Sequence, residues 1–528
     1  MTSYLFYGGR IHTMGRPGVV DAMLVVGDKV TAVGTEGEMR AFALSDTREV
    51  DLKGKAVYPG FHDSHIHFMQ YAMSLRRVNL HGVDSLEKGL EVVREAVKKA
   101  GPGSWVVGGG WDKSLWLRFP TRRELDSVSG DTPVVLSSKD GHSVWVNSRA
   151  LSIAGITSET ATPAGGAILK DERGEPTGIL QDAAQDLVWR FVPEDTFEEL
   201  LEACTEAIPR LWSMGITCVH APDGIELFKI GRKIREKGEY PLRIAVMPPV
   251  SALSVLSALE IRQGFGDDWV WTAQIKMFKD GSLGSSTALL FEPYEHLPGY
   301  CGVEVTSDRD LERDVRRCVE AGYGAAIHAI GDRAVARALD AIEANLAESR
   351  RKGIRHRIEH AQMVREQDVS RFKELDVIAS VQPAHVVADR YMADREWGKR
   401  SERAYPFGQL KRSGALLAFG SDAPVETPDP IFGIHCAVNR NLPGEGPETQ
   451  WHPSEKVTVE DAVRAYTKNA AYAVGREQVL GELVPGKCAD FVVLSVDLTE
   501  VPPDRIGEVR VLATSIGGEV VYGMENLG

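Results

Sequence analysis

The sequence is poor in cysteine, and the few cysteines that it has are not closely paired. Six of them are scattered over 528 residues, and no two form a Cys-x-x-Cys pair. This distribution argues against a disulfide-rich scaffold and against a zinc knuckle, because both need closely spaced cysteines. We therefore expect a chain that works in a reduced, cytoplasmic setting.

The chain also lacks an excess of basic residues and any long apolar segment. Its formal net charge is −14, whereas nucleic acids and anionic membranes attract proteins with a basic face. No stretch approaches the roughly 18 apolar residues of a membrane-spanning helix, and the first residues lack the pattern of a signal peptide. We expect a small-molecule substrate, no nucleic-acid partner and no membrane partner. A homodimer is expected only because homodimers are common.

The order of apolar segments predicts an α/β protein. Eight strand-like runs alternate with amphipathic, helix-like stretches, and eight is the number of strands that closes a (β/α)8 TIM barrel. The predicted strands are Val57–Phe68, Ile216–Ala221, Leu242–Pro248, Val270–Phe278, Gly324–Ala329, His356–Ala361, Val377–Gln382 and Leu416–Ser421. The predicted helices include Phe197–Met214, Arg309–Ala321, Ala334–Arg350 and Val459–Val474.

Other regions of the chain do not follow this alternation. The segment between the first two predicted strands is far longer than one crossover helix needs, which indicates a large insertion at about residues 70–195. Residues 1–56 and 477–528 consist of short strand-like runs and Gly-rich turns. We expect these two terminal segments to pair in one small β-sandwich, and the barrel to occupy residues 57–476.

Histidines gather where the predicted strands end. His65 and His67 are two residues apart, and side chains at this spacing lie on the same face of a strand. Neutral imidazole is the commonest protein ligand for transition metals, and functional groups of a barrel lie at the carboxyl ends of its strands. The other polar residues at such positions are Lys276, His328, His360 and Asp422. Together they predict a metal centre.

Lys276 lies in an otherwise largely apolar strand, where a lysine is costly to desolvate. Its head group could reach solvent or a carboxylate. Alternatively, carbamylation by CO2 would turn it into an anionic ligand that bridges two cations. Lys279 is the rival position for such a ligand.

The ordered set His-x-His, Lys, His, His and Asp resembles the pattern of the metal-dependent amidohydrolase superfamily. Its surroundings are similar to those in the branch that contains N-substituted formamide deformylases, and the resemblance covers nearly the whole chain. The motifs are Pro59-Gly-Phe-His-Asp-Ser-His-Ile-His67, Lys276-Met-Phe-Lys-Asp-Gly-Ser-Leu-Gly284, His328-Ala-Ile-Gly-Asp-Arg333, Arg357-Ile-Glu-His-Ala-Gln362, Gln382-Pro-Ala-His385 and Gly420-Ser-Asp-Ala-Pro-Val-Glu426. Lys279 departs from the pattern, because relatives tend to carry a small residue there.

The resemblance implies hydrolysis of a non-peptide C–N bond, in an amide or an N-substituted formamide. It implies one or two divalent ions, with zinc favoured, although such ligands also suit iron, manganese and nickel. The implied ligands are His65, His67 and Asp422 for one ion, His328 and His360 for the other, and carbamylated Lys276 with a hydroxide between them. Asp422 would act first as general base and then as general acid.

Further polar and aromatic residues are candidates for substrate binding. They are Trp111, His142, His220, Arg333, His385 and Glu426. His142 could stabilise a developing oxyanion or form hydrogen bonds within the insertion. Arg333 could bind a substrate carboxylate through two hydrogen bonds or pair with Glu359. Trp111 suits local packing as well as it suits a pocket wall.

Other functions would use the same residues. A deaminase, or a hydrolase of esters or lactones, would need the same metal ions. A catalytically inactive, metal-binding regulatory protein could also keep the fold. Asp422 argues against an inactive protein, because loss of catalysis would permit the loss of this residue.

Overall fold

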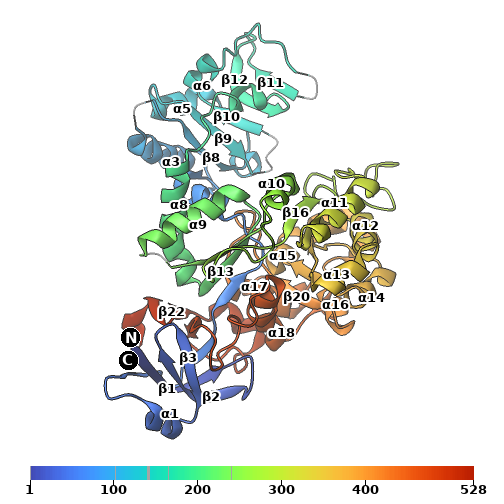
Figure 1. The fold of residues 1–528 in the computed structure, drawn as a ribbon. Coiled ribbons are helices and arrows are strands. Elements are labelled where there is room, and N and C mark those ends of the chain that lie inside the picture. Colours follow the sequence, from blue (N-terminus) through green and yellow to red (C-terminus); the bar gives the residue numbers. More distant parts are fainter. Residues whose placement is uncertain (1, 102, 140–142, 164–165, 239–240, 528) are drawn as a thin grey trace. The chain divides into compact units, whose positions relative to one another are not determined.

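The protein is described by a computed structural model that covers residues 2–101, 103–139, 143–163, 166–238 and 241–527 (Figure 1). It is a mixed α/β structure with two compact units. The larger unit comprises residues 1–69 and 205–528, and the smaller unit comprises residues 70–204. Within the described ranges, no helix is both long and apolar enough to cross a membrane.

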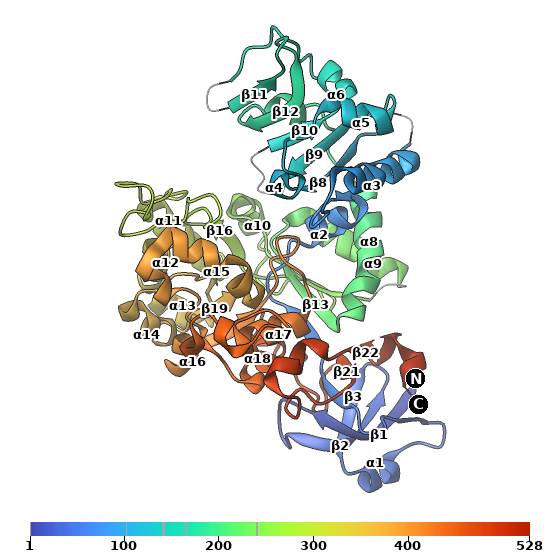
Figure 2. The same cartoon turned by 180° about the vertical axis from the view of Figure 1, so that it is seen from behind.

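Strands from both ends of the chain form one eight-stranded sheet in the larger unit. Its strands are β1 (Ser3–His12), β2 (Val19–Val26), β3 (Lys29–Gly34), β4 (Arg48–Asp51), β5 (Ala56–Pro59), β21 (Phe491–Leu494), β22 (Val511–Ile516) and β23 (Glu519–Tyr522). The order is β23-β22-β21-β5-β1-β2-β3, with β4 beside β1. The antiparallel pair β5 and β21 joins the two ends, and its register places Phe491 opposite Pro59. In both views the blue and red strands lie side by side (Figures 1 and 2).

Two parallel sheets make up the centre of the larger unit. The first has the order β6 (Phe61–Asp63), β13 (Ile216–Ala221), β14 (Arg243–Val246) and β15 (Val270–Thr272). The second has the order β16 (Ile275–Phe278), β17 (Ala325–Ala329), β18 (Arg357–His360), β19 (Ile378–Val381) and β20 (Leu416–Phe419). The predicted strand Val270–Phe278 is therefore divided into β15 and β16.

Backbone hydrogen bonds connect the edges of these two sheets. Lys276 N donates to Pro248 O at 2.8 Å, just after β14 ends. Ser64 N, just after β6, donates to Phe419 O at 3.0 Å. The two sheets therefore meet at two places. They are still separate sheets by their strand pairing, so the closed barrel stays a prediction.

Helices follow most of the parallel strands (Figure 2). They are α8 (Phe197–Ser213), α9 (Ile225–Lys237), α10 (Leu253–Ala258), α11 (Asp308–Glu320), α12 (Asp332–Glu343), α13 (Leu346–Lys352), α14 (Glu366–Glu374), α15 (Pro383–Trp397), α16 (Phe407–Arg412), α17 (Pro430–Asn439), α18 (Val459–Tyr466) and α19 (Lys468–Ala473). Two of the predicted helices are broken. Asn345 separates α12 from α13, and Thr467, whose hydroxyl donates to Val463 O, separates α18 from α19. Both residues compete for backbone hydrogen bonds through their side chains.

The smaller unit has its own sheet and core. The sheet has the order β11 (Gly166–Lys170), β12 (Pro176–Asp182), β10 (Ser143–Val146), β9 (Val134–Ser138), β8 (Val106–Trp111) and β7 (Val78–Asn79). Helices α3 (Leu86–Lys99) and α5 (Arg122–Ser129) pack with each other. The indole rings of Trp111 and Trp145 are buried in the apolar core of this unit.

Candidate metal centre

Two segments that are far apart in the sequence meet at the candidate centre. His65 and His67 follow β6, and Asp422 follows β20. Asp422 N donates to His65 O at 2.7 Å, and His67 N donates to Ala423 O at 2.9 Å. Asp63 strengthens this junction, because its carboxylate accepts hydrogen bonds from the backbone N–H groups of His65 and Ser421. The order of these segments therefore brings a carboxylate to the histidine pair.

The side chains of these residues form a compact group. His67 Nε2 lies 3.3 Å from Asp422 Oδ1, and His65 Nε2 lies 3.6 Å from the same oxygen. Burial alone would raise the pKa of Asp422. The hydrogen bond from His67 and the nearby imidazoles of His360 and His65 outweigh burial and hold that pKa well below its usual range. The group therefore combines a carboxylate with imidazole nitrogens, a donor set that suits several divalent ions.

Lys276 and Lys279 lie in different surroundings. Lys276 is buried, and its Nζ lies 3.4 Å from His65 Nε2. Burial lowers the pKa of Lys276 to about 8. The Lys279 ammonium instead lies 2.5 Å from Glu304 Oε1 and 2.6 Å from Asp308 Oδ1. Of the two lysines, Lys276 is the one that faces the histidine pair.

Three imidazoles each form a hydrogen bond at one ring nitrogen. His65 Nδ1 lies 2.6 Å from Glu359 Oε2, His360 Nδ1 lies 2.9 Å from Gln382 Oε1, and His328 Nε2 lies 2.9 Å from Gly281 O. These partners are oxygen acceptors, so the bonded nitrogen carries the proton and the other nitrogen has a lone pair. Burial lowers the pKa of His65 to about 4 and that of His328 to about 3, so both rings are neutral near pH 7.

His385 is a further imidazole at this centre. It lies in α15, and its Nε2 is 3.9 Å from Asp422 Oδ2. The ligand atoms of His360, His385 and Asp422 all lie within 4.8 Å of one another, as do those of His65, His67 and Asp422. In the described part of the chain, His385 Nε2 has no hydrogen-bond partner although it is buried. A buried polar atom without a protein partner calls for another partner, such as a water molecule, an ion or a bound ligand.

The backbone is strained at two of these residues. His360 has a φ of 74° and Asp422 has a φ of 61°. Side chains other than glycine rarely occupy this left-handed region, and such strain is concentrated at functional sites. At the ends of β18 and β20, the side chains of His360 and Asp422 therefore keep their directions at the cost of backbone strain.

The remaining predicted substrate residues lie in varied surroundings. Trp111 is buried in the smaller unit, and its indole donates to Leu136 O. His142 lies outside the described residues. Arg333 is half-buried in the first turn of α12. Glu426 is half-buried beyond β20, where burial raises its pKa and the nearby His385 opposes that shift.

His220 belongs to a second buried group, together with His62 and Cys218. Its Nδ1 lies 3.4 Å from Arg357 Nη1, and its Nε2 lies 3.4 Å from His62 Nδ1. A guanidinium can only donate, so His220 accepts at Nδ1 and donates from Nε2 to His62. No lone pair of His220 is left for a metal ion. Hydrogen bonds therefore link Arg357, His220 and His62 within the sheet interior.

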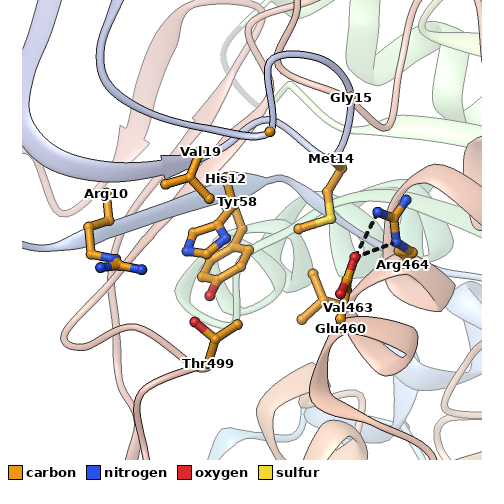
Figure 3. A pocket seen from close by; sticks show the side chains of 11 residues that line it. Arg10, His12, Met14, Gly15, Val19, Tyr58, Glu460, Val463, Arg464 and Thr499 are labelled. Carbon is orange, nitrogen blue, oxygen red and sulfur yellow. Dashed lines mark hydrogen bonds and ion pairs between the residues drawn. The ribbon is translucent and has the colours of Figure 1, made fainter. Parts of the chain in front are cut away.

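A pocket of about 270 Å³ lies beside the terminal sheet, and none of the predicted metal ligands lines it (Figure 3). Its polar groups are already paired. Arg464 bonds to Glu460, and both His12 and Tyr58 bond to Asp497. The His12 and Tyr58 rings are stacked with their centroids 4.3 Å apart. The bonds of His12 and Tyr58 to Asp497 connect the two ends of the chain, which explains why polar residues line this pocket.

Residues missed by sequence reasoning surround the predicted ligands. They are Glu359, Gln362, Gln382, Asp63 and Asp223. One signal was present, since Arg357 and Glu359 lie two apart in a buried strand and therefore share a face. Opposite charges on one buried face predict a local ion pair, but the sequence does not reveal its histidine partner.

Comparisons with known proteins agree with this geometry. The model of the amidohydrolase family matches residues 48–522. The chain is 36% identical over 524 residues to "Protein LONG AFTER FAR-RED 3" of Arabidopsis thaliana, a match that covers 95% of this chain and 88% of that protein. It is 26% identical over 540 residues to the N-substituted formamide deformylase of Arthrobacter pascens, covering 99% and 98% of the two chains.

A solved structure shares the fold along nearly the whole chain. It is the crystal structure of an uncharacterized metal-dependent hydrolase from Pyrococcus furiosus. The two structures superpose with a TM-score of 0.79 at 30% sequence identity, covering 94% of this chain and 100% of that chain. Together with the family match, this shows that the chain belongs to the amidohydrolase family of metal-dependent hydrolases.

Proposed function

We propose that this protein hydrolyses a non-peptide C–N bond in a small molecule, an amide or an N-substituted formamide. The observation that carries the proposal is the group formed by His65, His67 and Asp422 beside the buried Lys276. The likeness to the N-substituted formamide deformylase supports this choice of bond. Deaminase, esterase and lactonase activities would use the same group, so they belong in the same substrate screen.

We propose that the donor set holds two divalent ions, and that these ions are zinc. His65, His67 and Asp422 would hold one ion. His328, through Nδ1, and His360, through Nε2, would hold the other, because their remaining nitrogens are bonded to Gly281 O and Gln382. Bound ions would lower the pKa of a water molecule and polarise the carbonyl group of the substrate.

We also propose that Lys276 carries a carbamate. A buried ammonium 3.4 Å from His65 Nε2 would oppose the binding of a cation there. The ammonium first loses a proton, and the neutral amine then forms an N–C bond to CO2 and releases a second proton, so that a negative carbamate replaces the positive ammonium. A pKa of about 8 makes the neutral amine accessible near pH 7, and the carbamate oxygens would be shared by both ions.

The chain's own residues would move the proton and hold the substrate. Asp422 would accept a proton from the attacking water and pass it to the leaving nitrogen, as general base and then general acid. Gln362 Nε2 lies 3.4 Å from His385 Nδ1 and donates to it, so His385 presents an N–H at Nε2. We propose this N–H as a hydrogen-bond donor to the substrate, with Glu426 and Arg333 as further contacts.

We propose indirect substrate roles for Trp111 and His220 and a direct one for His142. Trp111 and His220 are engaged in the interior, so we propose that they act on the substrate only through the residues that they position. His142 stays a proposed oxyanion contact.

The domain arrangement is part of the same proposal. The hydrogen bonds between β14 and β16 and between β6 and β20 support a closed (β/α)8 barrel over residues 57–476. Residues of about 70–195 would be its insertion after the first strand. The pairing of β5 with β21 supports one small β-sandwich from residues 1–56 and 477–528.

Replacing Asp422 tests the function directly. We expect Asp422→Asn to lower kcat on an amide or formamide substrate by about 10²- to 10⁴-fold, because the amide cannot accept the proton. The circular dichroism spectrum should match that of the wild type. An unchanged kcat would refute the role of Asp422. Activity on esters or lactones alone would show that the protein cleaves a C–O bond and not a C–N bond.

A further inference from the structure

Glu359 occupies a position that the proposed catalytic scheme does not use. It lies in β18, one residue before His360, and its side chain is fully buried. Its Oε2 lies 2.6 Å from His65 Nδ1, and the imidazole is fully buried too. A carboxylate is rarely buried without a positive partner, so its charge requires an explanation.

Arg357 supplies that positive partner. Residues two apart on a strand share a face, and Arg357 Nε lies 2.5 Å from Glu359 Oε1. Arg357 Nη2 also lies 3.1 Å from Glu359 Oε2 and donates to Ser64 O and to the Ser380 hydroxyl. The guanidinium therefore bonds to its own strand, to β19 and to the segment after β6, and it holds the carboxylate in one place.

This arrangement determines which nitrogen of His65 faces the centre. Glu359 accepts the hydrogen of Nδ1, which leaves the Nε2 lone pair 3.6 Å from Asp422 Oδ1. A carboxylate behind an imidazole fixes the orientation of the ring and makes the opposite nitrogen a stronger ligand. The Gln382 amide behind His360 fixes orientation in a similar way, but it carries no charge.

We propose that Glu359 is a positioning residue that sets the metal affinity of His65, with Arg357 as its counter-ion. The proposal rests on the metal centre inferred above, but it concerns binding rather than turnover. The negative charge strengthens one ligand of the first ion, and the Arg357 guanidinium offsets the cost of burying that charge. The centre would therefore bind its two ions unequally, with the ion on His65 held more tightly.

The variant Glu359→Gln tests the charge while preserving the shape. The glutamine carbonyl can still accept the His65 hydrogen, so the ring keeps its direction. We expect an affinity for Zn²⁺ about 10- to 100-fold lower than that of the wild type, measured by competition with a chromophoric chelator on metal-free protein. Excess Zn²⁺ should restore full occupancy.

The pair Arg243 and Asp490 provides a matched control. Asp490 is buried and accepts two hydrogen bonds from the Arg243 guanidinium, at 2.5 Å and 2.9 Å. It has no bond to any of the proposed metal ligands among the described residues. Asp490→Asn therefore removes a buried charge beside an arginine in the same manner, and it should lower the thermal midpoint while leaving the Zn²⁺ affinity unchanged.

The outcomes separate this proposal from the proposed function. Weakened Zn²⁺ binding in Glu359→Gln alone supports the positioning role, even if no amide is hydrolysed. Wild-type affinity in Glu359→Gln, or an equal loss of affinity in Asp490→Asn, would overturn it. Failure of the reconstituted wild type to bind Zn²⁺ would overturn both the positioning role and the metal centre.

Discussion

Lys276 and Lys279 are three residues apart and both are buried, yet their side-chain amines have very different hydrogen-bond partners. Lys279 is surrounded by acceptors, since Glu304, Asp308 and Thr306 O lie within 2.7 Å of its Nζ. Lys276 forms no ion pair with a carboxylate within the described ranges. Its Nζ lies 3.4 Å from His65 Nε2 and 4.9 Å from the centroid of the Phe278 ring.

The difference indicates what each lysine does. Three acceptors satisfy all three hydrogens of an ammonium group, so the surroundings of Lys279 explain its burial as a structural connection. The burial of Lys276 is not compensated in this way, and an uncompensated buried charge is costly. Such a cost is typical of functional sites, where a bound species supplies what the protein lacks.

Of the two lysine substitutions, Lys276→Met should have the stronger effect on metal binding and turnover. Loss of the shared ligand should reduce the metal content from two ions per chain to one or none. It should also lower kcat roughly a hundredfold or more, because the second ion contributes several kcal/mol. Elemental analysis and turnover on the best amide substrate measure the two effects. A signal from a lysine carbamate should appear in the ¹³C NMR spectrum of the wild type supplied with ¹³C-bicarbonate and be missing from this variant.

Lys279→Met should produce the opposite pattern, and it serves as the matched control. Removal of charged hydrogen bonds should lower the free energy of unfolding by about 2 kcal/mol. The metal content should stay at that of the wild type. The midpoint of thermal unfolding measures the first effect, and elemental analysis measures the second. If Lys279→Met instead lost an ion and Lys276→Met did not, the roles of the two lysines would be reversed.

His356 is a buried basic residue that stays neutral, and it can be compared with the two buried lysines. His356 Nδ1 accepts from Ala325 N at 3.1 Å, and its Nε2 lies 2.9 Å from the Ser349 hydroxyl. Burial lowers the pKa of His356 from 6.5 to about 4. The folded state therefore binds fewer protons than the unfolded state between these two pH values. The stability that this histidine contributes is fully present above pH 6.5 and is lost as the pH falls to about 4.

The loss should amount to roughly 3 kcal/mol, at about 1.4 kcal/mol per unit of pKa shift. In His356→Asn the thermal midpoint should be lower at pH 7, but it should fall less steeply between pH 6.5 and pH 4. Equal slopes for the variant and the wild type would show that His356 does not contribute to acid sensitivity.

The sequence predicted the side chains that meet at the centre better than it predicted the residues that hold those side chains by hydrogen bonds. His65, His67 and Asp422 were predictable because the carboxyl ends of parallel strands meet at one edge. The supports come from contacts between strands that are far apart in sequence. Glu359 meets His65 across 294 positions, and neither residue by itself identifies the other.

Local chemistry explains the parts of the fold that differ from expectation. The predicted strand Val270–Phe278 lost its regular pairing at Ala273 and Gln274, where the Gln274 amide donates to Ala473 O. The long predicted helices ended early because Asn345 and Thr467 bond to preceding backbone carbonyls. Apolar periodicity alone does not report such side-chain bonds.

Two metal ions around Lys276 are the core of the proposed site, and the number of ions bound per chain can be measured without a substrate. Protein purified without chelators should be measured by elemental analysis, before and after reconstitution with Zn²⁺. We predict close to two ions per chain. A well-folded protein that binds no metal after reconstitution would contradict the account, and a single ion would contradict the carbamate bridge at Lys276.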